Sequence, residues 1–277
     1  WNPGDHMNKL KAGAQAALVL LCSAAAAHAQ GAAPTASRPQ TVDDIQACMQ
    51  RNLVRRGALR DLNLEVRDRE GNNHALRLKL YWKPTMTGDA RVNVKLLEPK
   101  AMSGSSYLML QSGSEESVYF HLPPEQKAIQ ITGKNTTEPL WGTDFSYGEI
   151  KQVLGLLYGG QTSRKADGVY ATRPAFVLET ATDVESTGYR KVLSYVDQGS
   201  CVLLKSEFFA KADKPLKVLE ADAASILSLD DYSVVLDYTM RNLQEGTRTQ
   251  VKLSDFTILE RLPERLFDPQ HFFEPFE

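Results

Sequence analysis

The sequence contains little cysteine, little histidine and no strong excess of charge of either sign. Its 277 residues include 3 Cys and 5 His, and 32 Lys+Arg stand against 34 Asp+Glu, which gives a formal net charge of −2. A dedicated nucleic-acid binder usually carries a basic excess, so no nucleic-acid partner is expected. With 42% hydrophobic and 24% charged residues, the composition is that of an ordinary globular protein.

The common motifs of metal sites and hydrolases are also missing from the sequence. It contains no H-E-x-x-H, no C-x-x-C and no G-x-S-x-G. The histidines after residue 30 (His74, His121 and His271) lie far apart in the chain. Acidic pairs such as 115–116 and 230–231 lie in a polar, turn-like context that is typical of solvated charge. We therefore expect a protein that is not an enzyme and that holds no metal ion or other cofactor.

A long apolar run lies near the N-terminus. Met7 is followed by a short basic segment, by an apolar stretch over residues 12–27, and by the small-x-small sequence Ala-His-Ala at 27–29. This order is typical of a secretory signal peptide, with cleavage predicted before Gln30. A transmembrane anchor is the alternative, but the run is short and Ala-rich and ends at the cleavage sequence. Residues 1–6 are interpreted as a non-native remnant or an upstream start.

The exported chain is predicted to begin with a flexible lead-in and a helix. Residues 30–40 are rich in Ala, Pro, Ser and Thr, as flexible segments often are, and residues 41–277 are predicted to form a single domain. Thr41 can cap a helix through the amide of Asp44. Apolar residues then recur on one face at Ile45, Cys48, Met49 and Leu53, and the helix is expected to end around residues 55–57.

From Leu62 onward the period of the apolar residues changes to two. Leu62, Leu64 and Val66 precede a turn at 71–73, and Leu76, Leu78, Leu80 and Trp82 follow it, which predicts a hairpin with one apolar and one wet, charged face. Further strands are predicted at 92–96, 107–110, 118–122, 128–131, 176–185, 190–196, 202–209, 216–221, 233–242 and 249–259. About a dozen short strands with few helices between them exclude a parallel βαβ fold. They predict a mainly β, antiparallel sheet that curls into an open barrel or wraps around something.

A second helix is predicted between these strands. Ser146 and Glu149 have the spacing of a capping box, and Gly159-Gly160 would end the helix. Its apolar stripe consists of Ile150, Val153, Leu154, Leu157 and Tyr158. This stripe is expected to lie across the apolar face of the sheet, as a lid. The interior beneath it could be filled with side chains, which is the commoner outcome in small barrels, or could leave an apolar cavity.

Two cysteines, Cys48 and Cys201, remain after the predicted cleavage. An exported protein folds where disulfides are permitted, so a bridge between them is one possibility. Two separately buried thiols are the other, because the sequence does not place the two Cβ atoms.

One segment resembles a known family. Residues 140–150, Leu-Trp-Gly-Thr-Asp-Phe-Ser-Tyr-Gly-Glu-Ile, are similar to the GTDFSYEDL segment of bacterial outer-membrane lipoprotein-sorting-like proteins, the LolA/LolB-like superfamily. Strand-like residues 191–197 and 203–208 and the closing element 262–269 also resemble the family pattern, so that the resemblance extends over residues 41–272. Gly148 and Trp141 depart from the usual residues at their positions.

This resemblance implies a half-open antiparallel β-barrel, with an N-terminal helix and a lid helix over an apolar cavity. It implies a periplasmic protein that binds lipid or lipoprotein acyl chains, and an inner-membrane exporter of the RND type as a partner. An acyl chain gains about 0.8 kcal/mol for each CH₂ group that leaves water, so such a carrier needs an apolar concavity and no catalytic groups. A monomer is expected.

The candidate site residues follow from the inward positions of the strands and from the motif. The predicted lipid-binding residues are Leu64, Val66, Leu78, Leu80, Trp82, Val94, Leu96, Phe120, Ile150, Val153, Leu154 and Leu157. The motif residues are Gly142, Thr143, Asp144, Phe145, Ser146 and Tyr147. Asp144 is expected to bond loop amides, and Phe145 to act as a hydrophobic staple before the lid. For each lipid-binding residue, ordinary core packing is the alternative.

A second function is compatible with the same fold. RseB-like regulators share this barrel and bind partner proteins, so the chain could instead be a periplasmic sensor or scaffold module. Such a regulator is expected to carry a second domain after the barrel. No linker is seen before the C-terminus of this sequence, so the carrier is favoured.

Overall fold

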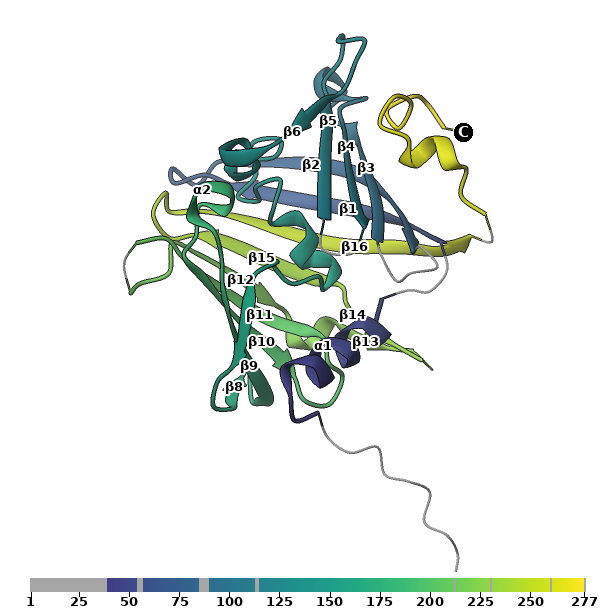
Figure 1. The fold of residues 1–277 in the computed structure, drawn as a ribbon. Coiled ribbons are helices and arrows are strands. Elements are labelled where there is room, and N and C mark those ends of the chain that lie inside the picture. The colour runs from purple at the N-terminus through teal and green to yellow at the C-terminus, as the bar shows by residue number, and fades with distance from the viewer. Residues whose placement is uncertain are drawn as a thin grey trace, which may run out of the picture. The chain divides into compact units, whose positions relative to one another are not determined.

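A computed structural model describes residues 39–276, with the exception of 54–56, 85–89, 113–114, 212, 230 and 260 (Figure 1). The predicted signal peptide and most of the predicted lead-in lie outside these residues. Within them, no helix is long and apolar enough to cross a membrane, and no cluster of three or more His, Cys, Asp or Glu is placed to hold a metal ion.

Helix α1 (Val42–Arg51) begins where the sequence predicts. The Thr41 hydroxyl accepts a hydrogen bond from the Asp44 amide at 3.1 Å, and the Asp44 carboxylate accepts one from the Thr41 amide at 3.0 Å. Ile45 and Met49 are buried on the predicted face. The helix ends earlier than predicted, because Asn52 forms its C-cap and the first strand already begins at Gly57.

The first half of the sheet is built from six strands: β1 (Gly57–Arg67), β2 (Asn73–Pro84), β3 (Ala90–Glu98), β4 (Ser106–Ser112), β5 (Glu115–His121) and β6 (Ile129–Ile131). In the β1–β2 hairpin, Leu62 lies opposite Leu78 and Leu64 opposite Leu76. These four side chains are buried together, so the predicted apolar face of the hairpin is confirmed.

The second half contains the remaining strands: β7 (Gln161–Arg164), β8 (Gly168–Tyr170), β9 (Arg173–Ala181), β10 (Lys191–Asp197), β11 (Leu203–Phe209), β12 (Lys217–Ala221), β13 (Ile226–Ser228), β14 (Ser233–Val235), β15 (Asp237–Asn242) and β16 (Thr247–Leu259). Strand β16 pairs with β1 and joins the two halves. Strands β13 and β14 form a separate two-stranded hairpin.

The main sheet has 14 strands in the order β6-β5-β4-β3-β2-β1-β16-β15-β12-β11-β10-β9-β7, with β8 paired to β9. Each pairing between these strands is antiparallel. No pairing among the described residues joins the end strands β6 and β7, so the sheet curls without closing on itself (Figure 1). The predicted half-open antiparallel barrel is confirmed.

The elements between the strands are short. They comprise α2 (Val184–Thr187) and the 3-10 helices η1 (Lys100–Met102), η2 (Gly133–Thr137), η3 (Ile150–Leu154), η4 (Ala223–Ser225) and η5 (Glu264–Phe267). Helix α2 occupies the end of a segment predicted as strand. The Asp183 side chain caps this helix by accepting hydrogen bonds from the amides of Glu185 and Ser186. The short strands β7, β8 and β13 were not predicted, since they lack a run of alternating apolar residues.

The outer face of β2–β4 is covered by the C-terminal segment, residues 261–276, drawn in yellow in Figure 1. Phe267 and Phe272 of this segment pack with Tyr81 and Leu108 in a second, smaller core. The Asn93 side-chain amide donates to two main-chain carbonyls of the segment, at Leu266 (2.7 Å) and Phe272 (2.9 Å). The prediction that this face of the hairpin is exposed to solvent is therefore wrong at Tyr81, which is only 4% exposed.

Candidate functional site

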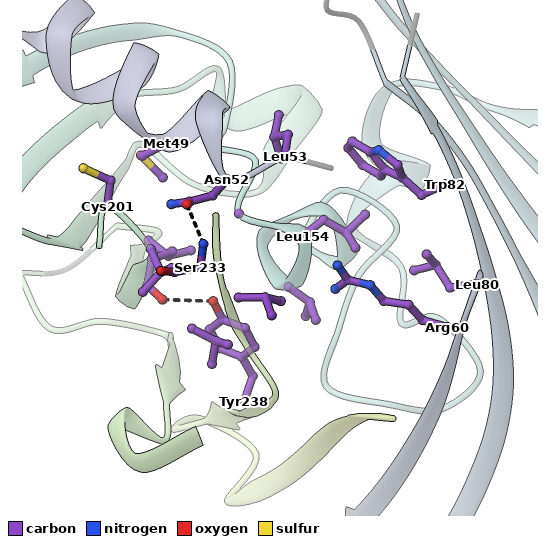
Figure 2. Close-up of a pocket in the computed structure, with 16 residues that line it drawn as sticks. Met49, Asn52, Leu53, Arg60, Leu80, Trp82, Leu154, Cys201, Ser233 and Tyr238 are labelled. Atoms are coloured by element: carbon purple, nitrogen blue, oxygen red, sulfur yellow. Dashed lines mark hydrogen bonds between the residues drawn. The ribbon is translucent and has the colours of Figure 1, made fainter. Parts of the chain in front are cut away.

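A small cavity lies inside the curl of the sheet, at the end of α1 (Figure 2). Its volume is about 50 Å³. The lining residues come from α1, β1, β2, η3, the start of β11, the β13–β14 hairpin and β15, and they are Met49, Asn52, Leu53, Arg60, Leu80, Trp82, Val153, Leu154, Gly155, Cys201, Val202, Leu203, Ser233, Val234, Val235 and Tyr238. Because most of these side chains are apolar and one is basic, the cavity is apolar and carries a positive charge.

The basic residue is Arg60, which lies on the inner face of β1. Its neighbours on that face, Ala58 and Leu62, are buried, and Arg60 itself is only 8% exposed. The register between β1 and β16 shifts at this point, between Leu59 and Asp61. Burial lowers the pKa of Arg60 to about 10, so the guanidinium remains charged at neutral pH. In Figure 2 its side chain extends from β1 toward Leu154.

A second, larger pocket of about 800 Å³ adjoins the cavity. The two share three lining residues, Met49, Leu53 and Gly155. The wall of the larger pocket mixes apolar and polar groups, among them Gln46, Gln50, Gln111, Glu116, Lys151, Leu156, Leu157 and Tyr158. Its volume falls within the range of about 300–1,000 Å³ that is typical of ligand pockets, whereas the cavity alone has room only for a small group.

The segment between the two pockets is the lid segment, residues 146–158. It contains η3, which ends at Gly155 in a left-handed conformation (φ 79°). The predicted helix through Tyr158 is therefore reduced to a single 3-10 element. The Glu149 carboxylate does accept from the Ser146 amide, at 2.7 Å, but Ser146 does not cap η3, whose N-cap is Glu149 without a side-chain bond.

Buried polar side chains hold the lid segment on the second half of the sheet. Glu149 has no exposed surface, yet its carboxylate accepts hydrogen bonds from the Tyr189 hydroxyl and from Lys217 Nζ, the latter at 3.1 Å. Burial, followed by the negative charge of Glu149, raises the pKa of Tyr189 above its ordinary value, so Tyr189 stays a donor. Gln152 accepts from the Ser206 hydroxyl at 2.9 Å.

The residues just before the lid segment are also fixed by hydrogen bonds. The Thr249 hydroxyl of β16 donates to the Asp144 carboxylate at 2.7 Å and accepts from the Asp144 amide at 2.9 Å, and the Thr247 hydroxyl donates to the same carboxylate. The expectation that Asp144 would bond loop amides is thus wrong: its carboxylate reaches across to the sheet. Phe145 is fully buried in the inner core.

The other motif residues complete this anchor. Thr143 donates from its hydroxyl to the Leu140 carbonyl at 2.7 Å, and Gly142 adopts a positive φ of 71° that favours glycine. The Tyr147 carbonyl accepts from the Tyr107 hydroxyl at 3.1 Å, and the Tyr147 ring packs against Phe120. The motif therefore shapes and fastens the chain that leads into the lid.

A disulfide fastens α1 on the other side of the cavity. Cys48 of α1 is bonded to Cys201, with Cα atoms 5.8 Å apart and a sequence separation of 153 residues. Asn52 adds two hydrogen bonds beside it: it donates to the Ser200 carbonyl at 2.7 Å and accepts from the Ser233 amide at 2.8 Å. The end of α1 is thereby joined to the turn before β11 and to the β13–β14 hairpin.

The predicted lipid-binding residues fall into three groups. Leu80, Trp82, Val153 and Leu154 line the cavity, and Leu157 lines the larger pocket. The remainder line neither of these two pockets: Leu64, Leu78, Val94, Leu96 and Ile150 are buried in the inner core, Phe120 packs against it, and Val66 is 5% exposed.

Sequence reasoning missed Arg60, Tyr238 and the β13–β14 hairpin as parts of the cavity wall. A signal for Arg60 was present, because it lies in phase with Leu62, Leu64 and Val66 on the inward side of the alternation. A charged residue at an inward position is uncommon, and it marks the place where the wall of an apolar interior is interrupted.

Comparison with known proteins supports the fold. The structure is similar to a domain from Vibrio parahaemolyticus named for outer membrane lipoprotein sorting (TM-score 0.73, 19% identity, covering 84% of this chain and 98% of that one). A DUF1329 family protein from Desulfovibrio piger gives a TM-score of 0.70 at 17% identity, covering 81% and 95% of the two chains. A LolA superfamily protein from Nitrosomonas europaea gives 0.63 at 16% identity, covering 83% and 98%.

A family model also matches the sequence over residues 88–272, more than half of the chain, and its description is that of an uncharacterized protein. The chain belongs to that family and has the LolA-like fold. No curated protein sequence matches it. In this LolA-like chain, the lid segment packs against the inner core of the sheet and lines both pockets.

Proposed function

We propose that this LolA-like protein is a periplasmic carrier, not an enzyme, that binds lipid or lipoprotein acyl chains inside its half-open barrel. The apolar cavity under the lid segment is the observation that carries this proposal. Around it, the inner face of the sheet is lined by aliphatic and aromatic side chains, which is the surface that an acyl chain needs in order to leave water.

The size of the cavity requires that the lid segment moves when a chain binds. At about 50 Å³ the cavity does not hold an acyl chain, but the pocket of about 800 Å³ beside it shares three of its lining residues. A shift of the lid segment at Gly155, which already adopts a left-handed conformation, would join the two spaces. The joined space would expose the predicted lipid-binding residues Leu80, Trp82 and Val153 to the chain.

The proposal also includes the compartment in which the protein acts and its membrane partner. Export with cleavage before Gln30 would place the protein in the periplasm, and an RND-type exporter in the inner membrane would be a partner that supplies or receives the cargo. The names of the similar structures, a lipoprotein-sorting domain and a LolA superfamily protein, support a role in lipoprotein or lipid traffic.

Native mass spectrometry of the mature protein, purified from a bacterial periplasm, tests the carrier. We expect a co-purifying lipid at a stoichiometric ratio, which solvent extraction then identifies. Leu154→Glu should abolish its binding, because it places a carboxylate in the cavity wall. Leu243→Glu is the matched control: Leu243 is 49% exposed in the β15–β16 turn, away from both pockets, and its substitution should leave the lipid in place.

If the purified protein contains no lipid and also fails to take up a fluorescent fatty acid, the proposed carrier function is contradicted. The same barrel would then serve as a sensor or scaffold that binds a partner protein, and capture of periplasmic partners on the immobilised mature chain would be the next measurement.

A further inference from the structure

The larger pocket lies between the two ends of the sheet. On one side its wall is formed by Gln111 of β4 and by Glu115 and Glu116 of β5, the strand next to the end strand β6. On the other side it is formed by residues 156–160, which lead into the end strand β7. Helix α1 completes the wall. The pocket is therefore placed where the barrel is incomplete, so a ligand can pass through it from solvent to the interior.

Helix α1 presents both apolar and polar side chains to the pockets. Met49 and Leu53 line both of them, whereas Gln46 and Gln50, which are four residues apart and share a face of the helix, line the larger pocket only. Within the described part of the chain, neither side-chain amide bonds to another residue, so each offers donors and an acceptor to a ligand. An amphiphile can thus place its chain beside Met49 and Leu53 and its polar group beside the two amides.

The basic residue in the wall of the larger pocket is already neutralised. Lys151 Nζ lies 2.7 Å from the Glu116 carboxylate and 5.1 Å from the centre of the Tyr158 ring. The Lys151 side chain is only 10% exposed, so this ion pair is largely shielded from water. Glu115 adds a second carboxylate. With one basic and two acidic residues among the described residues that line it, the wall has a net charge of −1 and leaves no positive charge for an anion.

An anionic head group is therefore poorly suited to this pocket. Burial removes water from a phosphate or carboxylate, which costs free energy unless a cation replaces the water. Lys151 could do so only by leaving Glu116, whose carboxylate would then repel the anion. An uncharged hydroxyl, ester or amide group loses less hydration, and the amides of Gln46 and Gln50 can bond it. Arg60, in the wall of the cavity, already interacts with other groups of the chain, so it is not a free charge either.

We propose that the larger pocket holds the polar group of the cargo and selects an uncharged one, a hydroxyl, ester or amide group attached to an acyl chain, and that Glu116 sets this selectivity by neutralising Lys151. This inference rests on the proposed carrier function and specifies its ligand class. The acyl chain would extend past Met49 and Leu53 into the space that opens under the lid segment. Glu116 acts without bonding the cargo, because it withholds the charge of Lys151 from an anion.

The test compares 1-oleoylglycerol with 1-oleoyl lysophosphatidate, which differ only in a phosphate. Each displaces the neutral probe N-phenyl-1-naphthylamine from the mature chain, and fluorescence titration at pH 8 gives the two affinities. We expect the wild-type chain to bind oleoylglycerol more tightly, by about tenfold. Glu116→Gln keeps the shape of the side chain and frees the ammonium of Lys151. It should strengthen the binding of lysophosphatidate by about tenfold, which corresponds to one charge-assisted hydrogen bond, and leave that of oleoylglycerol nearly unchanged.

Glu207→Gln is the matched control. Glu207 is also paired with a lysine, Lys205 at 2.8 Å, but it lies on β11 and lines neither of the two pockets. This variant changes the net charge by the same amount and should leave the ratio of the two affinities unchanged. The double variant Glu116→Gln with Lys151→Gln should return the ratio to its wild-type value, because no free ammonium then remains. Thermal unfolding shows whether each variant is folded, and Glu116→Gln alone provides the result if the double variant does not fold.

The outcomes separate this inference from the carrier function. If the wild-type chain prefers lysophosphatidate, or if Glu116→Gln changes the ratio no more than Glu207→Gln does, the carrier stands and the selectivity of the larger pocket is overturned. If neither lipid displaces the probe, both proposals are overturned. A triacylated lipopeptide carries uncharged ester and amide groups as well. Displacement at a lower concentration than oleoylglycerol would support a lipoprotein as the source of the cargo, and the reverse order would support a free glyceride.

Discussion

The lid segment is held on the inner face of the sheet by buried polar side chains in addition to its apolar ones, whereas the C-terminal segment covers the outer face mainly with aromatic rings. Glu149 and Gln152 hold the lid segment through Tyr189, Lys217 and Ser206. The C-terminal segment instead inserts Phe267 and Phe272 into a core of their own, as described above. Both pockets adjoin the lid segment, and residues 261–276 line neither of them.

This difference indicates which of the two segments can move away from the sheet. A hydrogen-bonded group that leaves its partner can bond water or a ligand, so part of the cost of opening a polar contact is recovered. A buried phenylalanine that leaves its core gains nothing in return and exposes apolar surface. We therefore expect the lid segment to open for cargo while the C-terminal segment remains in place.

The largest effect on stability is expected from the aromatic residues of the C-terminal segment. Phe272→Ala removes a side chain with no exposed surface and should lower the free energy of unfolding by about 3–5 kcal/mol. Urea denaturation measures this change. Acyl-chain binding, measured on the folded fraction, should be unchanged; weaker binding in proportion to the loss of stability would show that the two covers act as one unit.

The next largest effect should come from the disulfide beside the lid. Cys48→Ser combined with Cys201→Ser should cost about 2–4 kcal/mol, because the bridge no longer restricts the unfolded chain. Hydrogen exchange followed by mass spectrometry should show faster exchange in α1, which lines both pockets. Unchanged exchange in α1 would mean that the hydrogen bonds of Asn52 alone hold the helix in position.

A smaller loss of stability, with a larger change in motion, is expected at the lid. Glu149→Gln keeps the shape of the side chain but leaves Lys217 without its carboxylate partner, at a cost of about 1.5–3 kcal/mol. Exchange of the amides in residues 146–158 should accelerate more than exchange in residues 261–276, and probe uptake should become faster. Equal acceleration in both segments would contradict the distinction between them.

The smallest effect is expected in the pH dependence of stability, through Lys95 on the outer face of the sheet. Burial lowers the pKa of Lys95 to about 8, against an ordinary value of 10.5. Between these two values the unfolded chain holds a proton that the folded chain has released, so this residue should make stability rise with pH from about 8 to 10.5. The difference in urea midpoint between wild type and Lys95→Met should change over this range. A constant difference would show that Lys95 does not titrate there.

Much of the fold could be predicted from the sequence, because local pattern and burial agree over most strands. Leu62, Leu64, Leu76 and Leu78 alternate and face the same core, and Thr41 caps α1 as its spacing indicates. The half-open architecture came from the resemblance of residues 140–150 to a family and was confirmed by structural comparison.

The parts that could not be predicted depend on contacts distant in sequence. Asn93 and Lys95 occupy positions that alternation assigns to solvent, yet both are buried because the C-terminal segment covers them. The lid was predicted as a longer helix because Ser146 and Glu149 have capping-box spacing, while in the structure Glu149 also binds Tyr189 and Lys217. Neither partner could be identified from local sequence.

The open ends of the sheet have a consequence for how the protein behaves in a crowded compartment. A free strand edge is a template on which another chain can add a strand. Here one end is the three-residue β6, and the other is formed on β9 by the three-residue β8 and the four-residue β7, Gln-Thr-Ser-Arg, which is polar and carries a charge. Edges this short offer few hydrogen bonds to an incoming strand, so an incomplete barrel can stay open without polymerising through its edges.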